Sequence, residues 1–178
     1  PAGLVARLGD LGEAAGLTLR VATATGELLA LIDGPVPPQA SGWDCGVVQR
    51  QRHRLSPQVG PGSIVETVAG VPLRITGDAF FQSNTAGAEA LVTLVEEALS
   101  PQADETLLDA YSGGGLFGLT AGREAGRVIA VESAPTAAAD LRHNARGAPR
   151  PIRVIEGAVE EVLPHLETRW DLAVVDPP

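Results

Sequence analysis

The chain has 178 residues, of which 44% are hydrophobic and 20% charged, with a formal net charge of −9 and one cysteine. This composition is typical of a globular protein of one or two domains, and it excludes a disulfide framework and an apolar run long enough to span a membrane. The acidity does not exclude a nucleic-acid partner, because the whole charge deficit lies in residues 78–178, while residues 1–77 are balanced.

The ends of the chain predict a segment of a longer protein. There is no methionine, and the sequence stops on an apolar run that has just reached Asp176-Pro-Pro. No basic and apolar leader opens the chain, so we expect a cytoplasmic protein with no membrane partner.

Short apolar stretches broken by turn-forming residues make up the chain as far as about Thr76. Their spacing predicts a small β-rich or α+β unit over residues 1–77, with a short helix at Leu4–Ala15 before its strands. The expected strands are Leu17–Thr23, Glu27–Ile32, Val47–Leu55, Ile64–Val68 and Val71–Ile75, around a loop at Pro35–Pro38.

From Ser83 the apolar period becomes 3.6 residues, which predicts a helix capped by Ser83 or Asn84 that ends near Pro101. Strands and helices then alternate, as in a doubly wound parallel sheet, so residues 78–178 are expected to form an α/β domain. The expected strands are Thr106–Tyr111, Arg127–Glu132, Ile152–Glu156 and Leu172–Asp176, and the expected helices are Leu116–Ala125, Pro135–Ala145 capped by Ser133, and Val159–Leu166.

A glycine-rich turn, 109–118, follows the first of these strands, and Glu132 ends the next. Gly113, Gly115 and Gly118 satisfy G-x-G-x-x-G, a pattern that lets the backbone approach a ligand and presents free N–H groups. Glu132 could accept hydrogen bonds from both hydroxyls of a ribose. The pair predicts a nucleoside-containing cofactor, either a nicotinamide dinucleotide or S-adenosylmethionine, with a tight turn that merely packs as the alternative.

Asp176-Pro177-Pro178 comes at the end of the fourth strand. Ligands of open parallel sheets bind beyond the carboxyl ends of the strands, and two prolines would stiffen the turn that carries the carboxylate. Such an arrangement suits a planar base held beside a transferable group, which favours a methyltransferase over a nicotinamide enzyme. A plain Asp-Pro turn is the alternative.

The segment Gly77–Asn84 joins the last strand of the front unit to the first long helix. It holds two adjacent aromatic residues in a chain with only 3% aromatics. Phe80 could stack on a base lifted out of RNA, and the Gln82 amide could bind a cofactor or a base edge. Alternatively, Phe80 and Phe81 only fill the joint between domains.

Taken in order, five elements resemble the RNA uracil-C5 methyltransferase family over about Ile64 to Pro178. They are Phe80-Phe-Gln-Ser-Asn84, Asp109-x-Tyr-Ser-Gly-x-Gly-x-Phe-Gly118, Val131-Glu132, His143-Asn-Ala-Arg146 and Asp176-Pro-Pro. The resemblance implies a class I, Rossmann-like methyltransferase fold that ends here after its fourth strand. It also implies a monomer that transfers a methyl group from S-adenosyl-L-methionine to C5 of a uridine in structured RNA, tRNA or rRNA.

On the matching positions, the resemblance implies that Phe80 stacks near the uracil and that Asp176 faces both the target base and the sulfonium. The other cofactor-binding positions would be Gln82, Asp109, Tyr111, Gly113, Gly115 and Glu132. Enzymes of this family add a cysteine thiolate to C6 of the base, and a carboxylate then removes the C5 proton. Both groups are expected beyond Pro178, so no catalytic residue is predicted in this chain, which by itself is expected to be inactive.

Three positions depart from the family pattern, namely Ser112, Leu116 and Ala158, and they predict weakened cofactor affinity. Cys45 alone cannot hold an iron–sulfur cluster and has no activating neighbour in sequence, and nothing has metal-ligand spacing. Arg50, Arg52 and Arg54 would share one face of a strand, either solvated or facing phosphates.

Two other functions stay open. One is a base N-methyltransferase, which also uses Asp-Pro-Pro, and the other is a module that binds cofactor or RNA without turnover. His143 and Asn144 are expected to cap or pack a helix, and the acids between Glu156 and Glu167 to form a solvated surface.

Overall fold

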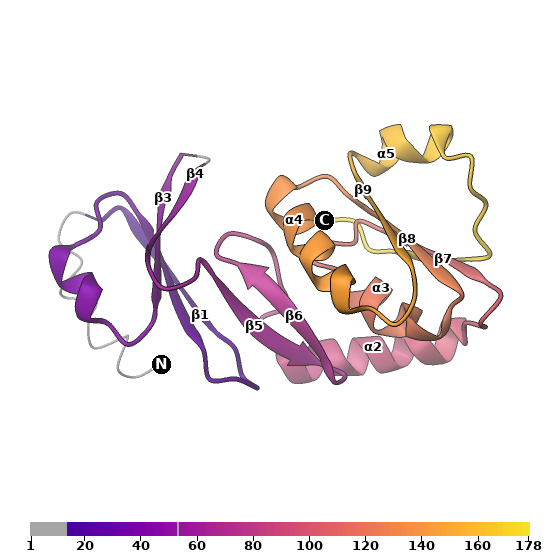
Figure 1. Ribbon diagram of the computed structural model, residues 1–178, viewed down its shortest axis with the longest axis horizontal. Helices are drawn as coiled ribbons and strands as arrows, with labels where there is room; N and C mark the ends of the chain where they lie inside the picture. Colours follow the sequence, from indigo (N-terminus) through magenta and orange to yellow (C-terminus); the bar gives the residue numbers. More distant parts are fainter. Residues whose placement is uncertain (1–13, 53) are drawn as a thin grey trace. The chain divides into compact units, whose positions relative to one another are not determined.

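The computed structural model describes residues 14–52 and 54–178 (Figure 1). The helix expected at Leu4–Ala15 falls almost wholly outside them. Contacts divide the chain into two compact units, one reaching Glu66 and including Thr76–Asp78, the other made of Thr67–Ile75 and Ala79–Pro178. No helix within the described part of the chain has both the length and the apolar character needed to cross a membrane.

The front unit is built on a four-stranded sheet in the order β1-β2-β3-β4. The strand β2 pairs antiparallel with β1 and parallel with β3, and its four inner residues, 29–32, are all buried. A short 3-10 helix, η2 (Pro38–Gly42), connects β2 to β3, and its Ala40 packs with Trp43 into the core of this unit. The strands are β1 (Gly16–Val21), β2 (Leu28–Asp33), β3 (Gly46–Gln51) and β4 (Arg54–Val59).

The prediction of a single strand over Val47–Leu55 is wrong, because the chain turns within this segment and forms two antiparallel strands, β3 and β4. Arg52 lies in the turn with a φ of 55°, so the three alternating arginines do not share a strand face. Arg50 forms a two-pronged ion pair with Asp33, with Nε–Oδ1 and Nη2–Oδ2 distances of 2.6 and 2.8 Å. The Arg50 guanidinium therefore links β3 to β2. The three arginines do not form the common face that the sequence suggested for phosphate contacts.

Strands β5 (Ser63–Val68) and β6 (Val71–Thr76) form a hairpin. Its two-residue loop, Ala69-Gly70, has φ values of 49° and 77°. Two positive φ values are the signature of the type I′ turn, whose twist matches that of paired strands. Residues 67–75 of the hairpin group with the second unit, although the sequence placed them in the front domain.

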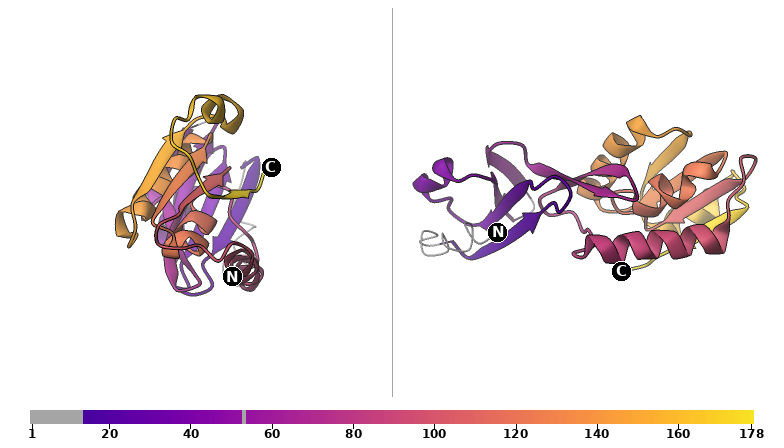
Figure 2. Two further views of the ribbon diagram at one scale, coloured as in Figure 1. Left: turned by 90° about the vertical axis from the view of Figure 1, so that its right-hand side faces the viewer. Right: turned by 90° about the horizontal axis from the view of Figure 1, so that it is seen from below.

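The second unit is a four-stranded, all-parallel sheet in the order β10-β7-β8-β9 (Figures 1 and 2). All five residues of β7 are buried, as expected for a strand covered on both faces. Alternate residues of β7 and β8 point into two separate apolar clusters, one shared with α2, α3 and α4, the other with α5. The strands are β7 (Thr106–Ala110), β8 (Arg127–Glu132), β9 (Ile152–Glu156) and β10 (Leu172–Val175). The predicted α/β class is confirmed.

The helices of this unit are shorter than predicted at their ends. The expected helix at 116–125 is a single α-turn followed by a 3-10 turn, and the one at 159–166 behaves likewise. Ser133 does not cap α4; Ala134 is the N-cap residue and has no capping side chain, while Pro135 opens the first turn as predicted. The bounds are α2 (Thr85–Leu99), α3 (Leu116–Leu119), η3 (Ala121–Glu124), α4 (Pro135–Asn144), η4 (Ala145–Gly147), α5 (Val159–Val162) and η5 (Leu163–His165).

Of the two cap residues proposed for α2, the structure selects Asn84. Its Oδ1 accepts a hydrogen bond from Gly87 N at 3.1 Å. Ala88 and Val92 are buried as predicted, but Leu91, expected on the same stripe, is 43% exposed.

We expect Asn84→Ala to lower the free energy of unfolding by about 1 kcal/mol, because it leaves a first-turn N–H of α2 without its acceptor. Ser83→Ala, one residue earlier and exposed, is the matched control and should change it by less than about 0.5 kcal/mol. Urea denaturation of both variants checks this, and equal effects would refute the assignment of the cap.

Candidate functional site

Three of the predicted site acids meet where the parallel strands end. Asp109 lies in β7, Glu132 is the last residue of β8, and Asp176 directly follows β10. Asp176 N lies 3.4 Å from Ala110 O, which aligns it with the end of β7. Burial is the main cause that raises the pKa of Asp109, and the charges of Asp176 and Glu132 raise it further, so the three carboxylates share one electrostatic environment.

Glu132 joins the glycine turn to the start of α4. Its Oε2 accepts a hydrogen bond from Gly113 N at 2.7 Å, and its Oε1 accepts one from Ala134 N at 2.6 Å. The side chain is buried, so these two bonds compensate for its lost hydration. Each oxygen keeps further acceptor capacity, which a ribose hydroxyl could use.

The glycines of the turn serve different needs. Gly113 and Gly115 both have positive φ, 54° and 98°, which glycine tolerates without strain. A Cβ on Gly115 would lie 2.6 Å from methyl carbons of Leu119 and Leu141, so packing forbids a side chain there. A Cβ on Gly113 would meet nothing within 4 Å, which leaves the space beside it open to a ligand.

Asp109 is the most perturbed titrating group of the described chain. Its Oδ2 accepts a hydrogen bond from Gly118 N at 2.8 Å, while its buried Oδ1 has no partner. Burial, assisted by the charges of Asp176 and Glu132, raises the pKa of Asp109 to about 7. The carboxyl therefore supports the turn from inside and is close to half-protonated at neutral pH.

Tyr111 has a contact that sequence reasoning missed. Its hydroxyl donates a hydrogen bond to the Glu160 carboxylate, which the sequence assigned to a solvated surface. That bond raises the pKa of Tyr111 and lowers the pKa of Glu160. The residues are 49 positions apart, so no local pattern could have indicated the pair. Ala158, where the family pattern has an amide or acid, is the N-cap of α5 and offers no polar side-chain atom.

The Phe-Phe-Gln segment is divided between core and surface. Phe81 packs against the core of the second unit, whereas Phe80 is 75% exposed. Gln82 is half-buried, and no described hydrogen bond joins it to Asp109, Glu132 or Asp176. The structure thus brings the three acids and the glycine turn together and leaves the place of Gln82 in the site a prediction.

Two hollows in the second unit, of about 230 and 270 Å³, lie among other residues. None of the predicted site residues lines either of them. The first is bordered by the tip of the β5–β6 hairpin, Leu119, Arg123 and residues 144 and 147–149. Among the residues with described positions, no cluster of three or more His, Cys, Asp or Glu could hold a metal ion.

No family model matches the chain. It is 31% identical over 91% of its length to an uncharacterised RNA methyltransferase of Thermosynechococcus vestitus. It is 33% identical over 80% of its length to the Homo sapiens tRNA (uracil-5-)-methyltransferase homolog A. A Pyrococcus abyssi tRNA (uracil-54, C5)-methyltransferase, solved with S-adenosyl-L-homocysteine, superposes on 91% of the chain with a TM-score of 0.73 and 25% identity.

The chain spans less than half of each of these proteins, namely 41% and 25% of the two relatives and 43% of the solved structure. The similarity extends over the front unit as well as the parallel sheet, since it takes in nine-tenths of this chain. The predicted resemblance and the predicted methyltransferase fold are confirmed by these matches.

Asp109→Asn tests the buried carboxyl through the pH dependence of stability. Between about pH 4 and pH 7 the folded protein holds this proton more tightly than the unfolded chain, whose pKa is near 3.8, so the wild type loses stability as pH rises. The variant keeps an acceptor for Gly118 N but cannot ionise. From pH 4 to pH 7, the free energy of unfolding of the variant should therefore rise by roughly 4 kcal/mol relative to that of the wild type. Denaturation at several pH values checks this, and a constant difference would contradict it.

Proposed function

We propose, from the relationship of this chain to RNA methyltransferases of the tRNA (uracil-5-) type, that it carries the S-adenosylmethionine site of an enzyme that methylates C5 of a uridine in structured RNA. The observation that carries the proposal is the junction of Gly113 and Glu132. The Gly113 N–H donates to the strand-terminal carboxylate of Glu132, and the space beside Gly113 is open. The Asp176-Pro-Pro turn follows the strand next to β7.

The residues present fit such a cofactor. Glu132 would accept the ribose hydroxyls with its remaining lone pairs, and the space beside Gly113 would admit the methionine end. Asp109, whose Oδ1 is buried without a partner, Tyr111 and Gly115 would shape the turn around it, and Gln82 would contact the cofactor. The bound cofactor would supply an electrophilic methyl group on a sulfonium.

The substrate side of the proposal rests on Phe80 and Asp176. Phe80 exposes three-quarters of its surface, unlike its neighbour Phe81, which packs against the core. An exposed ring stacks well on an unpaired base, which is how proteins usually read single-stranded RNA. Asp176 is exposed and would face the base and the transferable methyl group.

We propose that the thiolate and the base of the reaction come from sequence outside these 178 residues. The single thiol here, Cys45, is half-buried and packs against the core around Trp43 in the front unit. This place beside the core of the front unit gives no support to a catalytic role.

The base N-methyltransferase stays the alternative, since it would use the same Asp176-Pro-Pro turn. No observation favours it over the uridine reaction, and the relatives named above that carry a specific activity are uracil-5 methyltransferases. The cytoplasmic location and the monomeric state expected from the sequence stay predictions.

We expect Glu132→Gln to weaken binding of S-adenosylhomocysteine by about tenfold or more, because an amide accepts hydroxyl protons less strongly than a carboxylate. Titration calorimetry measures this, with Glu167→Gln, an exposed acid, as the control that should bind like the wild type. The amide nitrogen of Gln would also meet the N–H of Gly113 or Ala134, so an analogue that lacks the ribose hydroxyls should lose some affinity too, but less than S-adenosylhomocysteine does. An equal loss for both ligands would refute the ribose contact.

We expect the 178-residue chain to transfer no methyl group to undermodified tRNA or rRNA, although it binds S-adenosylhomocysteine. Incubation with labelled S-adenosylmethionine measures the transfer. Incorporation that survives Cys45→Ser would show that a nucleophile other than a cysteine acts, and incorporation abolished by Cys45→Ser would assign that role to Cys45. Either result would overturn the binding-only expectation for this chain.

A further inference from the structure

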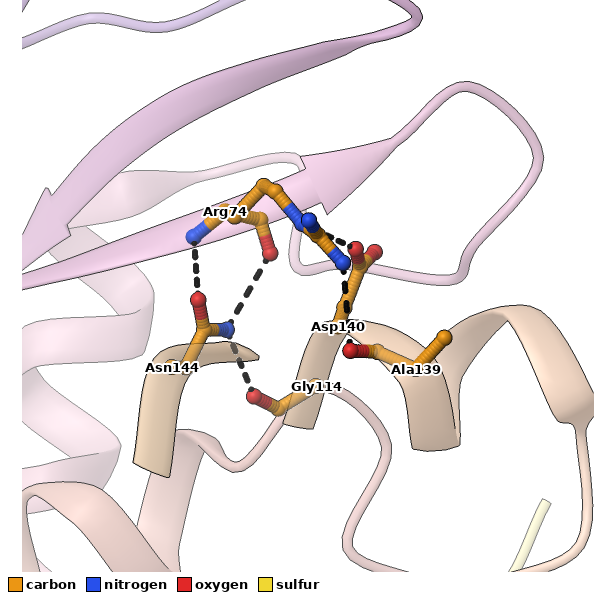
Figure 3. A network of polar contacts seen from close by, with 5 residues as sticks. All are labelled: Arg74, Gly114, Ala139, Asp140 and Asn144. Carbon is orange, nitrogen blue, oxygen red and sulfur yellow. Dashed lines mark hydrogen bonds and ion pairs between the residues drawn. The ribbon is translucent and has the colours of Figure 1, made fainter. Parts of the chain in front are cut away.

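Asn144, the last residue of α4, holds two distant backbone segments together (Figure 3). Its Oδ1 accepts a hydrogen bond from Arg74 N at 2.8 Å, and its Nδ2 donates to Arg74 O at 3.2 Å. The same Nδ2 donates to Gly114 O, in the glycine turn, at 2.9 Å. Both amide protons and the carbonyl oxygen of this side chain are therefore in use, whereas the sequence suggested only capping or packing.

The Arg74 side chain secures the same arrangement. Its Nε bonds to Asp140 Oδ1 at 2.8 Å, and its Nη2 donates to Ala139 O at 3.1 Å. Asp140 is buried and lies four residues before Asn144, hence on the same face of α4. Figure 3 shows Arg74 above the two side chains, with Asn144 between it and Gly114.

The glycine turn needs such a support. Glycines at positive φ have many alternative conformations, so the turn keeps its shape only where other groups hold it. On one side Ser112 N bonds to Val131 O at 3.0 Å and Gly113 N to Glu132. On the other side Asn144 binds the Gly114 carbonyl. Asn144 thus fixes the orientation of the peptide next to the open space at Gly113.

We propose that Asn144, held in place by Arg74 and Asp140, is a positioning residue that fixes the glycine turn in its cofactor-binding conformation. This inference rests on the function proposed above, because it assigns the turn to S-adenosylmethionine. Aspartate cannot replace Asn144, since it has the same shape but no N–H donors and would set a carboxylate against two carbonyl oxygens. Asn144 touches neither cofactor nor substrate in this proposal; it acts through Gly114.

The test is Asn144→Asp, read by calorimetry with S-adenosylhomocysteine and by the backbone amide resonances of Gly113, Gly114 and Gly115 in the free protein. We expect about tenfold weaker binding together with shifted glycine resonances. The matched control is Arg142→Gln, on the same helix, which removes a surface ion pair with Glu156 and should change neither readout. If Asn144→Asp does not fold, Asn144→Ala, which adds no charge, takes its place.

The outcomes separate this inference from the proposed function. If the wild type binds S-adenosylhomocysteine and Asn144→Asp binds it with the same affinity, only the positioning role is overturned. The same holds if Arg142→Gln loses as much affinity as Asn144→Asp. Weaker binding without any change at the glycine resonances would also overturn it, because the effect would not pass through the turn. A wild type that does not bind S-adenosylhomocysteine would refute the proposed cofactor site, and with it this role.

Discussion

The second unit depends on one buried carboxylate, that of Glu132. Its two oxygens hold the N–H groups of Gly113 and Ala134, so a single side chain fixes the turn after β7 and the entry into α4. A buried acid is stable only with such partners, and in return it helps to order both turns. The glycine turn, the position of α4 and the open space at Gly113 all follow from this mutual requirement.

Strands and turns of the second unit could be predicted from the sequence because their signals are local. Apolar runs bounded by Gly, Pro or charged residues placed β7 to β10 within about one residue of their observed ends. The helix ends were less predictable: Gly118 and Gly122 lie inside the expected helix Leu116–Ala125, and its second half tightens into a 3-10 turn. Val47–Leu55 was misjudged because the turn at Arg52 falls inside the polar run 49–54, which contains no glycine or proline to mark it.

Local sequence patterns could not predict which side chains contact each other in the site. The contacts of Asn144 with Arg74 and of Tyr111 with Glu160 join residues 70 and 49 positions apart. The motif letters also could not show that the two glycines differ. Both have positive φ, but a side chain on Gly115 would also meet Leu119 and Leu141, whereas the space beside Gly113 is open. The sequence could name the acids that gather at the strand ends, but not that Asp109 faces inward and carries an orphaned oxygen.

The course of the chain through the β5–β6 hairpin has a consequence for dissecting the protein. Residues 67–75 belong to the second unit, the next three to the first, and the chain then returns at Ala79. The two units are therefore interleaved, and no single cut separates them. A shortened polypeptide that starts at Asp78 would lack Val68 and Leu73, both fully buried in the core with β7 and α2, along with the arginine that neutralises Asp140.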